Sequence, residues 1–326
     1  MSPAKGLDIG TSRIVVAEPN GSHYHYKAQL NAFVSLPGSR LTESGLHKEG
    51  IPFKVMGSEL VVYGDKADRL ARVFCGELRR PMQKGMLNPA ESQSLEVIEQ
   101  IVVSLCGQPK DGERICFSVP TPHPGAEGNL TYHQAALSGL LEHLGFRPKC
   151  VGEGLAVVLA ELDASNYTGV GISFGGGMCN GCLAYLGAPV VSFSTTKAGD
   201  YVDRCVARVT GEPVNTVRQF KEESFNLNGR GANVLEQALS IYYGDAIDAA
   251  VNSLERALSE TRNVPKLDKP VPVLAGGGTA KVPGFLPRLE AALGRARLPI
   301  SISTVRLAAD PLNTTAKGAL RAAVLE

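Results

Sequence analysis

Short apolar runs alternate with amphipathic stretches along most of this 326-residue chain. Apolar runs bounded by turn residues predict strands, and apolar positions three and four apart predict helices. The expected strands are Arg13–Ala17, Leu60–Tyr63, Ile115–Val119, Val170–Phe174, Cys182–Tyr185 and Val271–Ala275. The expected helices are Asp65–Phe74, Ser92–Leu105, Tyr132–Leu144, Gly154–Leu162, Ala198–Val209, Thr216–Glu223, Asn233–Glu260 and Phe285–Ala292. The alternation predicts an α/β protein.

An internal repeat divides the chain into two similar halves. The segments "KGLDIGTSRIVVAE" and "VGISFGGGMCNGCLAYL" both predict a strand, a glycine turn and a second strand. Aligning them pairs Asp8 with Ser173 and Gly10 with Gly175, at an offset of 165 residues. Each copy is followed about a hundred residues later by a further strand and helix. We therefore expect two lobes, each directing one hairpin toward a shared cleft, with the polar segment 87–93 connecting the lobes.

The glycine turns suit an anion but match neither common nucleotide motif. No Gly-Lys-Ser/Thr follows the glycines, as a P-loop requires, and no correctly spaced glycine opens a helix, as the dinucleotide-binding pattern requires. Glycine turns do present consecutive backbone N–H groups as an anion-binding concavity. Asp8, Thr11 and Ser12 could hold phosphate oxygens and a hydrated Mg²⁺. Two such hairpins, with a third glycine cluster at 276–278, favour a phosphate site over a structural turn.

Composition narrows the class of protein. Lys and Arg total 33 against 32 for Asp and Glu, so net charge gives no signal for nucleic acid or an anionic membrane. No apolar run reaches the length of a membrane span, and the first residues lack the apolar core of a signal peptide, which predicts a cytoplasmic protein. Seven scattered cysteines indicate reduced thiols.

The order of the motifs resembles the actin/Hsp70/sugar-kinase superfamily, and in particular the bacterial actins MreB and MamK. "GLDIGTS" and "ISFGGGMCNGCLA" resemble the two phosphate motifs, and "CVGEGLAVVLAEL" resembles the connecting segment. "KAGDYVDRCV" resembles the base of the cleft, "VRQFKEE" the ribose-binding region and "VLAGGGTAKVPGF" the adenosine motif. "VVYGDKADRL", "RRPMQKGMLNP" and "DPLNTTAKGAL" are similar to MreB sequences.

The resemblance implies a site for ATP and Mg²⁺. It implies catalytic roles for Glu153, which would orient the attacking water, and for Asp8, which would hold Mg²⁺ through water. The implied nucleotide-binding residues are Gly10, Thr11, Ser12, Arg13, Ser173, Gly175, Gly176, Gly177, Met178, Gly199, Asp200, Lys221, Glu222, Gly276, Gly277 and Gly278. Glu153 has an alternative role, because a glutamate there also interacts favourably with the N-terminus of the following helix.

The resemblance further implies a two-lobed actin-like ATPase fold, built on a duplicated ribonuclease H-like core. The expected lobe I core is 1–32, 73–150 and 306–326, with a small subdomain IB over 33–72. Lobe II would comprise 151–198 and 264–305, with subdomain IIB over 199–263. Only 77 residues separate Gly199 from Gly276, so the strand-rich insertion of MreB is missing and IIB is reduced.

Ser173 departs from the family pattern. The second phosphate motif of the family begins with aspartate, and a hydroxyl pair follows its glycines; this chain has Ser173, Met178 and Cys179 at those places. A serine cannot supply the negative charge that hydrated Mg²⁺ prefers. We expect nucleotide to bind through the backbone while hydrolysis is slow or absent.

Two further features have ordinary explanations. Cys179 and Cys182 form a lone Cys-x-x-Cys without the other ligands of a zinc site or the helix N-terminus of a redox motif, which favours a structural role. The basic run "GELRRPMQKG" could bind an acidic partner, although a solvated basic face is the simpler interpretation.

The expected function is nucleotide-dependent self-assembly into cytoskeletal filaments, with a role in cell shape. The partner would be the protein itself or a cytosolic protein, with no nucleic acid and no direct membrane anchor, because no amphipathic helix precedes Gly6. The alternative is a non-polymerising, PilM-like scaffold or switch that recruits a partner. A phosphotransferase of the sugar-kinase branch is a third class. The choice between ATP and GTP stays open.

Overall fold

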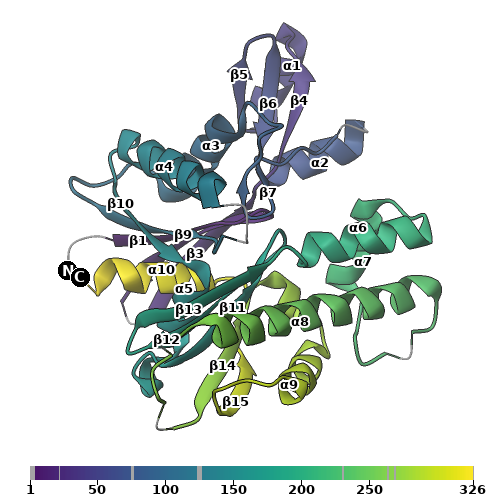
Figure 1. The fold of residues 1–326 in the computed structure, drawn as a ribbon. Helices are drawn as coiled ribbons and strands as arrows, with labels where there is room; N and C mark the ends of the chain where they lie inside the picture. Colours follow the sequence, from purple (N-terminus) through teal and green to yellow (C-terminus); the bar gives the residue numbers. More distant parts are fainter. Residues whose placement is uncertain are drawn as a thin grey trace.

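The computed structural model describes residues 4–21, 23–74, 77–122, 127–229, 231–262, 264–267 and 269–325. Two five-stranded sheets form two lobes that lie one above the other, and two helices fill the space between them (Figure 1). The sheets contain most of the apolar runs of the sequence, because strands buried on both faces need apolar residues on both.

The first sheet has the order β10-β9-β1-β2-β3. Its strands are β1 (Ala4–Ile9), β2 (Arg13–Asn20), β3 (His23–Leu30), β9 (Arg114–Val119) and β10 (Arg147–Gly152). β1 pairs antiparallel with β2 and parallel with β9, and β9 pairs parallel with β10. The outer face of this sheet packs against α3 (Ser94–Cys106) and α4 (Glu127–His143).

The second sheet repeats the first. It has the order β13-β12-β11-β14-β15, with strands β11 (Gly169–Phe174), β12 (Cys179–Tyr185), β13 (Ala188–Thr195), β14 (Val271–Gly276) and β15 (Ile302–Leu307). β11 pairs antiparallel with β12 and parallel with β14, as β1 does with β2 and β9. The predicted repeat and the two-lobed α/β fold are confirmed.

The outer face of the second sheet is covered by helices of the second half. α8 (Val234–Glu260) and α9 (Phe285–Arg295) share one apolar core with the sheet. α6 (Gly199–Thr210) packs against α8, and α7 (Val214–Glu223) packs against α6. Over 199–263 the residues that the structure describes form α6, α7, α8 and loops and contain no strand. This is where the sequence predicts a reduced subdomain.

Two central helices join the lobes. α5 (Glu153–Glu161) packs on β11 and β12, and α10 (Thr314–Val324) packs on β1 and β9. They approach so closely that a Cβ added at Gly318 would lie 1.8 Å from the carbonyl oxygen of Ala156. A Cβ at Gly6 would likewise lie 2.1 Å from the carbonyl oxygen of Ala316. The lobes are therefore connected by a tightly packed helix pair rather than by a flexible linker.

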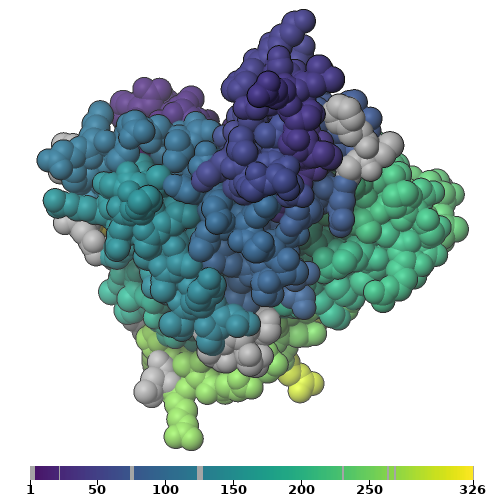
Figure 2. Space-filling view, turned by 90° about the horizontal axis from the view of Figure 1, so that it is seen from above, coloured from purple at the N-terminus to yellow at the C-terminus, as the bar shows by residue number. Residues whose placement is uncertain are grey.

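A small subdomain extends lobe I. It contains β4 (Phe33–Pro37), β5 (Phe53–Met56) and β6 (Glu59–Tyr63) in the order β4-β6-β5, with α1 (Arg40–Lys48) and α2 (Asp65–Phe74). Figure 2 shows this part projecting beside the helices of lobe II. A short hairpin of β7 (Met82–Gln83) and β8 (Met86–Leu87) follows it.

The expectation that 87–93 connects the lobes is wrong. This segment leads from β8 into α3, and both belong to lobe I. Its polar residues serve local structure, since the Asn88 amide donates a hydrogen bond to the carbonyl oxygen of Arg80 at 3.2 Å. The connection between lobes is instead β10 running directly into α5.

Candidate functional site

The first hairpin turns at Gly10–Arg13 between β1 and β2. The amide of Gly10 donates to the carbonyl oxygen of Arg13 at 2.9 Å and closes the turn. Asn31, which is fully buried, donates its side-chain amide to the carbonyl oxygen of Gly10 at 2.9 Å. The turn is therefore fixed to the sheet of lobe I.

The second hairpin is built in the same way in lobe II. The amide of Gly175 donates to the carbonyl oxygen of Met178 at 3.0 Å. The amides of Gly199 and Asp200, at the start of α6, donate to the carbonyl oxygens of Gly175 and Gly176 at 3.1 and 2.7 Å. The hairpin is thus held against a helix N-terminus, a position that favours anions.

The two hairpins meet across the space between the lobes. A Cβ at Gly176 would lie 2.2 Å from Ser12 Oγ, and a Cβ at Gly177 would lie 2.2 Å from Thr11 Oγ1. Real Cβ atoms do not approach so closely, and only glycine, which has no Cβ, allows this contact. The glycine run of the sequence is therefore explained by the close approach of the opposite lobe.

The third glycine cluster lies beside the second hairpin. A Cβ at Gly277, whose φ is +89°, would lie 2.3 Å from the carbonyl oxygen of Phe174. Thr279 Oγ1 donates to the carbonyl oxygen of Gly175 at 2.8 Å. The loop after β14 and the second hairpin therefore form one surface of lobe II.

These segments line a single cleft of about 690 Å³, in the size range of small-molecule sites. The structure brings all the predicted site residues to its lining except Gly276. Those present are Asp8, Gly10, Thr11, Ser12, Arg13, Glu153, Ser173, Gly175, Gly176, Gly177, Met178, Gly199, Asp200, Lys221, Glu222, Gly277 and Gly278. Gly276 ends β14, opposite Ser173 on the neighbouring strand.

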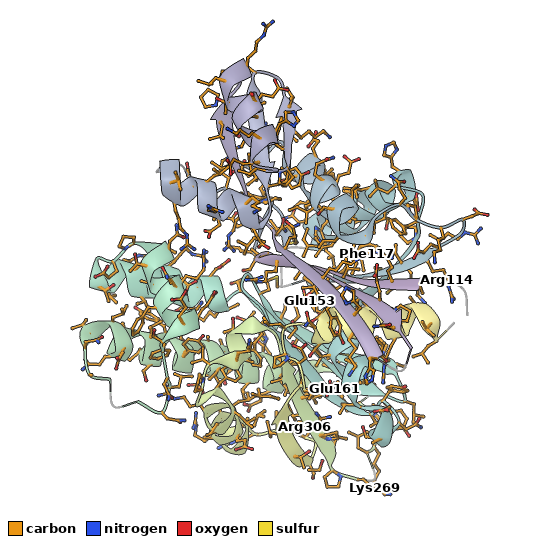
Figure 3. The ribbon with its side chains drawn as sticks, turned by 180° about the vertical axis from the view of Figure 1, so that it is seen from behind. Arg114, Phe117, Glu153, Glu161, Lys269 and Arg306 are labelled. Carbon is orange, nitrogen blue, oxygen red and sulfur yellow. The ribbon has the colours of Figure 1, made fainter. Side chains whose placement is uncertain are left out.

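Two carboxyl groups share the floor of the cleft. Ser118 Oγ donates to Asp8 Oδ1 at 2.6 Å, and burial raises the pKa of Asp8 to about 6. Glu153 begins α5 and lies between the lobes (Figure 3). Burial, and after it the negative charge of Asp8, raise the pKa of Glu153 to about 8. Two buried carboxyls on one cleft floor suit a bound cation, because a cation favours their charged forms.

Ser173 and Asn180 face Glu153 from the second hairpin. They are directly opposite in the β11–β12 register, and both are buried. Both polar side chains act against the rise of the pKa of Glu153. Asn180 Oδ1 also accepts the backbone N–H of Thr121, in lobe I, at 2.8 Å. Ser173 thus acts on Glu153 as a neutral donor.

The α6–α7 wall of the cleft carries an ionic cluster. Lys221 is buried, and its Nζ lies 2.6 Å from Asp203 Oδ1 and 3.3 Å from the carbonyl oxygen of Gly199. Arg218 pairs with Asp203 at 3.1 Å and with Asp200 at 3.3 Å. The charge of Lys221, predicted to contact ribose, is therefore engaged within the protein.

Several lining residues were missed at the sequence level. Asp203 lies three positions after Asp200, and Arg218 lies three positions before Lys221, so helical spacing alone places each beside a predicted residue. Gly85, Lys281, Leu312 and Thr315 lie inside segments that resemble the family but were not predicted as site residues. Phe225 and Asn226 had no sequence signal, because the loop after α7 brings them to the cleft.

Cys179 and Cys182 lie on β12 and are buried. Burial raises the pKa of both thiols, to about 11 for Cys182. Thiols that stay protonated are poor nucleophiles and poor metal ligands. Within the described part of the chain, no group of three or more His, Cys, Asp or Glu side chains could hold a metal ion. Cys75 lies outside the described residues.

The two lobes, repeated hairpins and shared cleft define an actin-like fold. The structure resembles the MamK double helical filament with a TM-score of 0.73 and 21% identity, over 99% of this chain and 98% of that chain. It resembles MreB 5 of Spiroplasma citri bound to AMPPNP with a TM-score of 0.69 and 14% identity, over 98% and 95%. Ethanolamine utilization protein EutJ from Carboxydothermus hydrogenoformans is also similar, with a TM-score of 0.56 and 16% identity, over 97% and 89%. The predicted resemblance to the MreB/MamK fold is confirmed.

The sequence identifies a more specific family than the fold does. The Volactin family profile matches residues 3–323, and the chain belongs to the Volactin family. None of the curated proteins matches the sequence. In the described residues, every helix is too short or too polar to cross a membrane.

Proposed function

We propose that this protein binds ATP with Mg²⁺ between its lobes and assembles into cytoskeletal filaments according to nucleotide state, with slow or impaired hydrolysis. The observation that carries the proposal is the pair of glycine hairpins, one from each lobe, that line one cleft. Backbone N–H groups of such turns bind phosphate oxygens. A ligand gripped from both lobes stabilises the closed arrangement, so nucleotide state would alter the shape of the protomer.

The roles within the site follow from position and chemistry. The first hairpin, with Thr11 and Ser12, would contact the phosphates from lobe I, and Gly175–Gly177 would contact them from lobe II. Gly277 and Gly278 would lie beneath the nucleotide. Glu153 would position water at the cleft floor.

The donor set fits a hydrated Mg²⁺. Burial raises the pKa of both Asp8 and Glu153, and the negative charge of Asp8 adds to the rise at Glu153. A divalent cation held by the nucleotide phosphates, with Asp8 bonding to its water, would neutralise that charge. When bound, it would neutralise developing charge on the phosphates. Ser173 offers hydrogen bonds but no second charge, which supports weak hydrolysis.

Relatives of the same fold support nucleotide binding by analogy. MamK is known as a double helical filament, and MreB 5 of Spiroplasma citri binds AMPPNP. Because the sequence identities are low, these relatives support only a shared fold. The geometry of the two hairpins supports the class of ligand.

The alternative is a non-polymerising scaffold or switch that recruits a partner. One observation favours it: the described residues of 199–263 form helices and loops without any strand. A reduced subdomain leaves less surface for contacts along a filament. Both candidates require nucleotide binding, so binding is the first property to measure.

Titration calorimetry with ATP and Mg²⁺ tests the shared step. Gly177→Ala should lower affinity at least tenfold, because the new Cβ would meet Thr11 Oγ1 at 2.2 Å and force the hairpins apart. Gly139→Ala is the matched control, since its Cβ would meet nothing within 4 Å. Equal affinities for both variants and the parent, or no heat of binding at all, would contradict the proposed site.

A further inference from the structure

Two adjacent arginines before the β7–β8 hairpin point to different parts of the molecule. Arg79 forms an ion pair with Glu91 and also donates to Ser35 Oγ at 3.2 Å, so all these contacts are within lobe I. Arg80 instead contacts the first phosphate hairpin and lobe II. Both arginines of the basic run are therefore engaged within the protein, whereas Lys84 of the same run is exposed.

Arg80 lies where the two hairpins meet. Its Nη1 atom donates to Ser12 Oγ at 3.1 Å and lies 3.5 Å from both the carbonyl oxygen of Thr11 and Asp200 Oδ1. Asp200 belongs to the first turn of α6 in lobe II, and Figure 1 shows β7 on the side of lobe I that faces this helix. The side chains of Arg80 and Asp200 are 19% and 13% exposed. Such limited exposure shields the ion pair from solvent screening.

The segment that carries Arg80 is itself held in place. The backbone amide of Asn88 donates to the carbonyl oxygen of Pro81 at 2.9 Å, which closes the loop. The amide of Gly85, at the hairpin tip, donates to Thr11 Oγ1 at 3.0 Å. A Cβ at Gly85 would lie 2.8 Å from Met178 Sδ, on the opposite lobe. This short loop therefore touches both phosphate hairpins.

We propose that the Arg80–Asp200 ion pair is a latch that holds the two lobes closed, and that it slows the exchange of ligand in the cleft. It joins the lobes directly, so it adds to closure whether or not a nucleotide is bound. The cleft opens only when the pair separates, and ligand leaves through that opened state.

The ionic environment allows the latch to open. Arg218, from the same lobe as Asp200, lies 3.3 Å from Asp200 Oδ1. When the lobes separate, Asp200 keeps this partner, and Arg80 becomes hydrated. Breaking a buried ion pair is costly when one charge stays buried without a partner. Here neither charge is left in that state. The latch is therefore reversible rather than permanent.

Small-angle X-ray scattering of the nucleotide-free protein tests the latch. Arg80→Gln should shift the radius of gyration to a larger value than that of the parent. Arg79→Gln is the matched control, because it removes the neighbouring charge without touching lobe II, and its radius should stay at the parent value. An unchanged radius for Arg80→Gln would overturn the latch.

A charge exchange separates the latch from simple misfolding. Arg80→Asp alone should open the lobes, and Arg80→Asp combined with Asp200→Arg should restore the smaller radius. Restoration requires the two positions to interact. If the double variant is as open as the single one while both melt cooperatively, the ion pair does not hold the lobes.

The effect of the latch on ligand exchange rests on the proposed nucleotide binding, and it is measured in a separate experiment. Release of a fluorescent ATP analogue should be roughly five- to tenfold faster from Arg80→Gln than from the parent, the scale of a typical coupling between sites. If the parent binds no nucleotide, the proposed function fails while the scattering result still decides the latch. If binding is normal and release is unchanged in Arg80→Gln, the control of exchange is refuted.

Discussion

Ser173 decides how the two halves of the cleft differ in chemistry. It occupies in β11 the place that Asp8 occupies in β1, and the two hairpins share the same closing hydrogen bond. Lobe I therefore brings a carboxylate to the cleft floor, and lobe II brings a hydroxyl. The hydroxyl hydrogen-bonds to Glu153, whose pKa is already raised by burial and by the negative charge of Asp8. A third carboxylate would suit this site only with a cation present.

Ser173→Asp should therefore raise the rate of ATP hydrolysis about tenfold or more in the presence of Mg²⁺, because a preorganised charge is restored beside the reacting phosphate. Phosphate release measured under single-turnover conditions checks this. Ser173→Ala is the control and should not exceed the parent rate. A Ser173→Asp protein that binds nucleotide normally and hydrolyses at the parent rate would show that this position does not limit the reaction.

The hairpin residues of the site could be predicted from sequence because they act through local backbone. Glycine turns between strands determine where N–H groups point, whatever lies elsewhere in the chain. Asp203 and Arg218 pair across two helices, and Arg80 reaches Asp200 from 120 positions away. Such contacts depend on how elements pack, and no spacing rule in a single sequence reveals them.

Among the elements, α4 is joined to the β7–β8 hairpin through a buried histidine. The backbone amide of Leu87 donates to His133 Nδ1 at 3.2 Å, so the imidazole is neutral. Burial lowers the pKa of His133 to about 4. In the unfolded chain the same group titrates near 6.5. Between these values the unfolded state binds the proton and the folded state does not.

The protein should therefore lose stability as pH falls from about 6.5 toward 4, by about 2 kcal/mol between pH 7 and pH 5 from this group. His133→Asn keeps an acceptor for the Leu87 amide and removes the titration, so its free energy of unfolding should fall less over that range. Urea denaturation at several pH values measures the difference. Parallel pH curves for parent and variant would assign the acid sensitivity to other groups.

The α5–α10 pair depends on the absence of a side chain at Gly318. Gly318→Ala should destabilise the protein by about 3 kcal/mol or more, since the added Cβ would lie 1.8 Å from the carbonyl oxygen of Ala156 and the helices would have to separate. Gly244→Ala in α8 meets nothing within 4 Å and should stabilise by about 0.5–1 kcal/mol through helix propensity. Thermal unfolding of both variants provides the comparison. Equal melting temperatures would refute tight packing of the pair.

Elements with strong apolar periodicity were predicted close to their observed bounds. The helix expected over Asp65–Phe74 is α2, and the strand expected over Val170–Phe174 is nearly all of β11. The strands without an expectation lie mainly at sheet edges. β10 and β15 are edge strands with several polar or half-exposed positions, so their sequences lack a continuous apolar run. Hydrogen bonding to the neighbouring strand, rather than a local sequence pattern, determines where these edge strands form.

At the scale of the whole molecule, the duplicated fold places one hairpin of each lobe at the same cleft, so a single ligand there would contact both lobes. Equivalent strands of the two sheets end at the same cleft, and α5 with α10 forms the axis between them. Separating the lobes moves the two hairpins apart and breaks the contacts at Ser12 and Gly85. A ligand held by both hairpins would therefore couple the shape of the molecule to occupancy of the cleft, as in two-lobed proteins that close around a ligand.

If this coupling drives filament assembly, ATP should promote assembly and ADP should support less of it, because only ATP has a γ-phosphate to fill the space where both hairpins meet. Sedimentation with light scattering, in ATP, ADP and no nucleotide, measures the assembled fraction, and electron microscopy shows its form. Gly177→Ala should assemble poorly in every condition, whereas Gly139→Ala should match the parent. A parent protein that binds ATP but never exceeds a dimer would exclude filaments and favour the scaffold, since closure would then serve recognition of a different partner.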